Sequence, residues 1–102
     1  IKAYSYEALP RHAFNLIINA TSLSLSSKIP LVSKEIINKN TFCYDLMYSN
    51  NETIFTKWAI ENGAMRAVDG LGMLVEQAAE SFFIWHGVKP DTAKVISALK
   101  NY

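Results

Sequence analysis

Apolar and polar positions alternate along the chain in blocks that predict short strands separated by helices. Two apolar runs, 14–19 and 41–48, are short, are bounded by polar residues and contain β-branched or aromatic side chains, which favours strands. A third and very short strand is predicted at residues 66–68. The first run suits a strand that is buried on both faces of a sheet.

Capping residues mark the predicted helices between and after these strands. Thr53 can cap a helix that ends at residues 62–63, where glycine suits the left-handed position after a helix. The longest helix is expected over 71–86, and a last one begins at residues 90–91. Because strands and helices alternate, the sequence predicts an α/β fold with a small, mainly parallel sheet of about three short strands.

The long helix has two apolar faces. One is a stripe that we expect to face a core, and its members are Leu71, Leu74, Val75, Ala78, Phe82 and Trp85. Met73, Gln77 and Ile84 lie together outside that stripe. The helix is therefore expected to be covered on a second side.

Composition narrows the choice of partners. Of the 102 residues, ten are basic and nine are acidic, and no run of like charge provides a surface for nucleic acid or for a membrane. The single Cys43 and two distant histidines give neither a disulfide nor a zinc site. No apolar run approaches the ~18 residues of a membrane span, and no signal peptide is evident. We therefore expect a cytoplasmic protein without a bound metal.

Candidate ligand-binding residues follow the predicted strands. Ligands of open parallel sheets bind beyond the carboxyl ends of the strands, which here means residues 21–22, 46–48 and Gly70. Each has a structural alternative: Thr21 as a loop cap, Tyr48 as a core aromatic, Gly70 as an ordinary helix-entry glycine. Gln77, likewise, could be a solvated boundary residue. Asp45 is interpreted as a structural hydrogen-bond anchor and not as a site residue.

Four stretches together resemble the C-terminal part of shikimate dehydrogenase. They are NATS at 19–22, YDLMY at 44–48, DGLGMLVEQAA at 69–79, and WHG at 85–87. Their order and spacing match over nearly the whole chain. The resemblance implies a partial Rossmann-like, three-layer domain and an NADP-dependent interconversion of 3-dehydroshikimate and shikimate, within the chorismate route to aromatic amino acids.

The resemblance also implies how the chain is divided. Residues 1–69 would be the end of the dinucleotide-binding domain, and 70–102 would be C-terminal helices that pack on an absent substrate domain. The catalytic lysine and aspartate, and the glycine-rich turn of the cofactor site, would lie outside this chain, so that it holds no catalytic residue. Because the chain begins at Ile1 without a methionine, we expect a fragment. Because the lysine and the phosphate-binding turn are absent, we expect it to be inactive by itself.

By the same resemblance, Leu46 and Gly70 border the nicotinamide, Thr21 approaches the cofactor, and Tyr48 and Gln77 hydrogen-bond the substrate. We name Met73, Gln77 and Ile84 the joint surface, because they would meet the absent domain or allow the fragment to associate with itself. Ser24 departs from the family pattern, which has glycine there. A non-catalytic nucleotide-domain fragment and a quinate/shikimate dehydrogenase paralogue are the alternatives.

Overall fold

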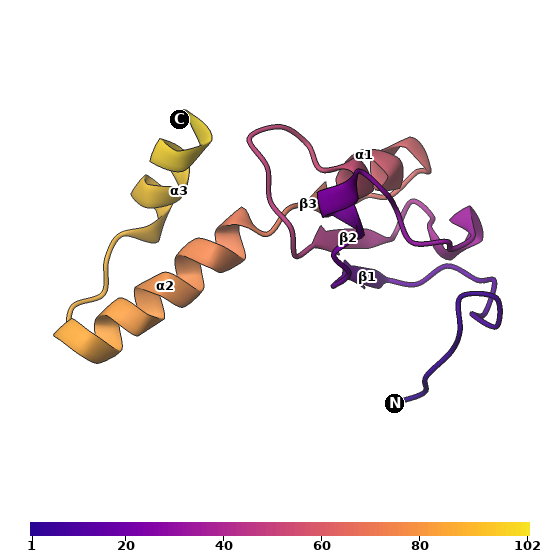
Figure 1. Cartoon of the computed structure of the whole chain (residues 1–102), viewed down its shortest axis with the longest axis horizontal. Coiled ribbons are helices and arrows are strands. Elements are labelled where there is room, and N and C mark those ends of the chain that lie inside the picture. The colour runs from indigo at the N-terminus through magenta and orange to yellow at the C-terminus, as the bar shows by residue number, and fades with distance from the viewer.

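The computed structural model describes residues 1–102 and contains a three-stranded sheet flanked by helices (Figure 1). The elements, in chain order, are β1 (Leu16–Asn19), the 3-10 helices η1 (Leu23–Ser26) and η2 (Lys34–Ile36), β2 (Phe42–Asp45), α1 (Ile54–Glu61), β3 (Arg66–Val68), α2 (Leu71–His86) and α3 (Thr92–Lys100). The predicted α/β order is confirmed. The first two strands are shorter than the apolar runs that predicted them.

The sheet is parallel throughout, with the strand order β1-β2-β3. Ile17 pairs with Cys43, and Cys43 pairs with Ala67, so these three side chains share one face. Helix α1 packs against β2 and β3 on that face, where Phe55 and Ala59 are buried. The core is therefore formed between α1 and one side of the sheet.

The opposite face of β1 is not covered. Leu16 and Ile18 alternate with Ile17, and each is 55% exposed. The prediction that β1 is buried on both faces is wrong for these residues, because α1 supplies a helical layer on one side only. An apolar run reports which side chains suit burial, whereas burial itself requires an element that covers them.

Helices α2 and α3 form an antiparallel pair that extends to one side of the sheet (Figure 1). Val75 is buried between them, and Val95 and Leu99 of α3 line a shallow groove along α2. Trp85, at the far end of α2, is 75% exposed. The predicted apolar stripe thus lines the groove with α3 from Leu74 to Phe82, and Trp85 lies beyond it.

Cys43 lies at the centre of the sheet and is completely buried. Burial raises the pKa of its thiol, because the thiolate would lose its hydration. At neutral pH the thiolate fraction is therefore even smaller than that of a free cysteine. We expect dithionitrobenzoate to leave the native thiol unmodified and to titrate it after unfolding in denaturant. Rapid labelling of the native protein at neutral pH would contradict the position of β2.

Candidate functional site

The carboxyl ends of β1, β2 and β3 lie along one edge of the sheet, because the three strands are parallel. The N–H of Leu46, just after β2, donates to the carbonyl oxygen of Asn19 at 3.0 Å. The N–H of Gly70, just after β3, donates to the carbonyl oxygen of Met47 at 2.8 Å. The segments that follow the strands therefore contact one another through their main chains, and Leu46 and Gly70 are brought together.

Gly70 is buried with its α-carbon against the main chain of Leu46. A β-carbon at position 70 would lie 2.2 Å from the Leu46 carbonyl oxygen and 2.8 Å from the carbonyl carbon. The φ of Gly70 is −80°, so glycine is required for space and not for an unusual backbone conformation. Gly72 differs, because no atom outside its chain neighbours and its own helix backbone lies within 4 Å of the position that its β-carbon would take.

Thr21 is held in the turn after β1 by the side chain of Asn19. The Oδ1 atom of Asn19 accepts from the Thr21 N–H at 3.2 Å and from the Thr21 Oγ1 hydroxyl at 2.7 Å. Thr21 Oγ1 also accepts from the N–H of Leu23 at 3.4 Å. Its hydroxyl proton is therefore already used within the chain, and Thr21 can offer a ligand only an acceptor, its methyl group or its main chain.

Asp45 ends β2 and is completely buried beneath this edge. Its carboxylate accepts from the side chains of Asn19, Ser24 and Thr53, and from the N–H of Met47. The interpretation of Asp45 as a structural anchor therefore agrees with its contacts. Sequence reasoning missed the partners: Asn19 ends a predicted strand, but the second predicted strand continues to residue 48, so the pairing of Asp45 with Asn19 could not be anticipated.

The start of α2 lies next to the same edge. The helix begins at Leu71, with Gly70 as its N-cap residue, and the Asp69 carboxylate accepts from the N–H of Leu71 at 3.1 Å. The Asp69 side chain thus accepts from the first N–H of the helix, although Gly70 and not Asp69 is the N-cap residue. The turn between β3 and α2 is fixed by this bond and by the bond from Gly70 to Met47.

Tyr48 and Gln77 do not line the same pocket. Tyr48 is 49% exposed and lines a pocket of about 620 Å³ that also includes Asp69 and Leu71, whereas Gln77 is not among the residues that line it. Gln77 is exposed on α2, and its Nε2 donates to the Leu74 carbonyl oxygen at 3.2 Å. The structure therefore does not bring the two predicted substrate residues together in one pocket of this chain.

The joint surface is open to solvent. Gln77 is exposed, Met73 is 43% exposed and Ile84 is 78% exposed, and none of the three lines the groove between α2 and α3. Helix α3 therefore does not cover this surface, which leaves an amide flanked by apolar side chains on the outside of the molecule.

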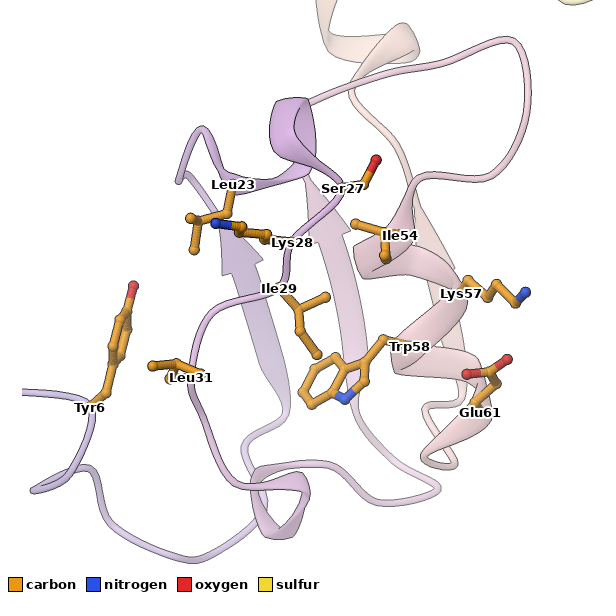
Figure 2. Close-up of a pocket in the computed structure, with 10 residues that line it drawn as sticks. All are labelled: Tyr6, Leu23, Ser27, Lys28, Ile29, Leu31, Ile54, Lys57, Trp58 and Glu61. Atoms are coloured by element: carbon orange, nitrogen blue, oxygen red, sulfur yellow. The ribbon is translucent and has the colours of Figure 1, made fainter.

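A larger pocket, of about 880 Å³, lies between α1 and the segment that follows β1 (Figure 2). Its floor is apolar: the indole of Trp58 lies beside Ile29, with Ile54 and Leu31 to either side. None of the five residues predicted to contact cofactor or substrate lines this pocket. It is therefore separate from the candidate site.

No three metal-ligating side chains from His, Cys, Asp and Glu are grouped in the structure. None of the helices has the length and apolar character needed to cross a membrane.

Comparison with known proteins identifies relatives of the whole chain. The family model of the shikimate 5′-dehydrogenase C-terminal domain matches residues 70–100. The shikimate dehydrogenase (NADP(+)) of Colwellia psychrerythraea is 48% identical over 100 residues, which cover 98% of this chain and 36% of that protein. The chain therefore spans about a third of the length of the curated relatives that it matches.

Solved structures share the same arrangement of elements. The crystal structure of an Ael1 enzyme from Pseudomonas putida matches 92% of this chain and 35% of its own, with a TM-score of 0.83 and 44% identity. The 5-ketofructose reductase of Gluconobacter sp. matches 85% of this chain and 32% of its own, with a TM-score of 0.72 and 34% identity. The chain is therefore part of a Rossmann-like α/β unit, and its sequence belongs with the C-terminal part of the shikimate dehydrogenase family.

Proposed function

We propose that this chain works as the C-terminal part of an NADP-dependent oxidoreductase that interconverts 3-dehydroshikimate and shikimate. The identity of 48% with a shikimate dehydrogenase (NADP(+)) across nearly the whole chain carries the proposal. The sheet edge that gathers Leu46 and Gly70 supports it, because parallel α/β sheets bind their ligands at this edge. A cytoplasmic location and a role in aromatic amino acid biosynthesis belong to the same proposal.

The residues at the edge suit the nicotinamide end of a dinucleotide. Thr21 and Leu46 are both half-buried, so a ligand can reach them from outside the chain. Leu46 would give the ring an apolar wall that excludes water, and Gly70 would keep the main chain of Leu46 in place. The bound cofactor would supply the hydride that passes to or from the substrate carbon.

Tyr48 and Gln77 would contact the substrate after the rest of the enzyme closes over them. Both are exposed on this chain, and each carries a polar group that can pair with a hydroxyl: the phenol of Tyr48 and the amide of Gln77. On this proposal residues 1–69 end the dinucleotide-binding domain, and the helices of 70–102 pack on a substrate domain through the joint surface.

The test is an assay of the full-length polypeptide that contains these residues. Shikimate with NADP should produce NADPH, followed by its absorbance, at a higher kcat/KM than quinate with NADP or shikimate with NAD. A preference for quinate would support the paralogue alternative. Reduction of 5-ketofructose without turnover of shikimate would favour the chemistry named for the Gluconobacter relative, and no turnover of any of these would contradict the proposal.

The 102-residue chain by itself is expected to show no dehydrogenase activity. The family's lysine and aspartate pair, and its phosphate-binding glycine turn, have no counterpart among these residues, so neither proton transfer nor tight cofactor binding is provided. The measurement is NADPH formation from shikimate by the purified chain. A rate above that of buffer alone would contradict the expectation.

The isolated chain is also expected to associate with itself through the joint surface. Met73 and Ile84 are apolar and exposed there, and an exposed apolar surface is stabilised by contact with a second copy. In sedimentation velocity experiments the double change Met73→Glu and Ile84→Glu should shift the chain toward monomer. Ile60→Glu, on the exposed side of α1, is the control and should leave the distribution unchanged. If the double change and the Ile60→Glu control shift the distribution equally, the joint surface is not the surface through which the chain associates.

A further inference from the structure

Asp45 is a completely buried carboxylate without a cationic partner. Its Oδ1 accepts from Asn19 Nδ2 at 3.2 Å and from the Met47 N–H at 3.1 Å. Its Oδ2 accepts from the hydroxyls of Ser24, at 3.0 Å, and Thr53, at 2.7 Å. Four donors thus surround two oxygens, which fits the ionised, acceptor-only form of the side chain.

These donors come from different segments of the chain. Asn19 ends β1, Ser24 lies in η1, and Thr53 caps α1 by accepting from the N–H of Thr56. A buried charge without a counter-ion is stable only while its hydrogen bonds are kept, because each lost donor leaves part of the charge unsolvated. Asp45 therefore holds the ends of two strands and the start of a helix at fixed positions.

Two of the four partners of Asp45, Asn19 and Met47, contact residues of the proposed cofactor site. Because Nδ2 of Asn19 faces Asp45, its Oδ1 faces Thr21, from which it accepts two hydrogen bonds. Met47 donates its N–H to Asp45 and accepts from the N–H of Gly70 through its carbonyl oxygen. Leu46 lies in sequence between the two ends of that connection.

We propose that Asp45 is a positioning residue for the cofactor site: it contacts no ligand itself and sets the places of Thr21, Leu46 and Gly70 at the nicotinamide end. This inference rests on the proposed function. Ser24, which replaces the glycine of the family pattern, provides one of the four donors. In this chain the anchor thus includes a hydroxyl that the family pattern does not provide.

The first test compares Asp45→Asn with the wild type in the full-length enzyme. Asparagine keeps the shape but carries no charge and places an N–H₂ group among donors. We expect kcat/KM for NADP to fall by about 10- to 100-fold, because the reacting ring is displaced. The inhibition constant of adenosine 2′,5′-bisphosphate, which has the adenosine end of NADP and no nicotinamide, should change less than about twofold. A general loss of structure would weaken the binding of both NADP and the bisphosphate.

Ser24→Ala keeps the inference testable if Asp45→Asn fails to fold, because it removes one donor and leaves three. It should lower kcat/KM for NADP by about 2- to 10-fold, again without changing the inhibition constant of the bisphosphate. Ser33→Ala is the matched control, since Ser33 Oγ accepts from the Glu35 N–H at the start of η2 and has no bond to Asp45.

The outcomes separate the two proposals. A wild-type enzyme that does not turn over shikimate with NADP contradicts the proposed function itself. An active wild type whose Asp45→Asn and Ser24→Ala variants keep their kcat/KM for NADP overturns only the positioning role of Asp45. A similar loss in bisphosphate binding and in kcat/KM for NADP also overturns it, because the effect would then not be confined to the nicotinamide end.

Discussion

Replacing Gly70 with alanine is expected to destabilise the protein by about 1–3 kcal/mol, the usual cost of adding a methyl group where there is no room. The new β-carbon would lie 2.2 Å from the carbonyl oxygen of Leu46, so the main chain after β2 or after β3 must move. That movement would stretch the bond from the Gly70 N–H to the Met47 carbonyl oxygen. Denaturant unfolding followed by circular dichroism measures the loss.

Two further variants separate this clash from other effects of glycine replacement. Gly70 is also the N-cap residue of α2, a position where serine is a better cap than glycine. If lack of space causes the loss, Gly70→Ser should destabilise the protein at least as much as Gly70→Ala does. If loss of the cap causes it, Gly70→Ser should be about as stable as the wild type. Gly72→Ala, which meets no atom within 4 Å, should stabilise the helix by up to about 1 kcal/mol. Equal losses at positions 70 and 72 would contradict the contact with Leu46.

Replacing Gln77 with leucine is expected to lower kcat/KM for shikimate by about 10- to 100-fold in the full-length enzyme. Leucine has a similar size but cannot pair with a substrate hydroxyl, which would then be left without its partner. The KM for NADP should stay unchanged, because the residues proposed to contact the cofactor lie at the sheet edge. Stability should change by less than about 0.5 kcal/mol, since Gln77 is exposed and its side chain makes a single hydrogen bond, at 3.2 Å, to the main chain of its own helix.

Glu76→Leu is the control for this prediction. Glu76 precedes Gln77 on α2 and is also exposed. The change therefore removes a polar side chain of the same length from the same helix. Its kcat/KM for shikimate should stay within about twofold of the wild type. Similar losses for both variants would indicate a general effect on α2 and not a hydrogen bond from Gln77.

Element boundaries that depend on local chemistry were predictable from the sequence. The N-cap role of Thr53 and the left-handed glycines after α1 and α2 follow from backbone and side-chain preferences that act within a few residues. For α2 the predicted range and the observed range, Leu71–His86, agree. For β1 and β2 the apolar runs extend beyond the paired residues, because strand ends are set by hydrogen bonds to a neighbour that the sequence does not display.

Burial was less predictable, since it depends on elements far apart in sequence. Ile17 and Ile18 are the same residue type in the same apolar run, yet only Ile17 faces α1 and the core. Trp85 continues the apolar stripe of α2, and no element of this chain reaches it. The sequence could state which side chains suit a covered position, but not which of them are covered within these 102 residues.

The position of the candidate site was predictable from the sequence, but the hydrogen bonds that hold its residues in place were not. The rule that ligands bind at the carboxyl ends of parallel strands located Leu46 and Gly70 at one edge. The hydrogen bonds under that edge were not predictable, because they join Asp45 to residues 26, 21 and 8 positions away. Which of several nearby polar residues pair is decided by tertiary contacts.

The same carboxylate limits how this chain can change in length. Loops of most proteins accept insertions and deletions, because their backbone is exposed and makes few specific bonds. Here the turn after β1 and the loop from β2 to α1 each carry a donor that must reach Asp45, so an added or missing residue in either would leave a buried charge short of a partner. The exposed connection between α2 and α3 has no bond to Asp45. Length variation among natural or engineered relatives should therefore collect at that connection and be absent from the two loops beside the carboxylate.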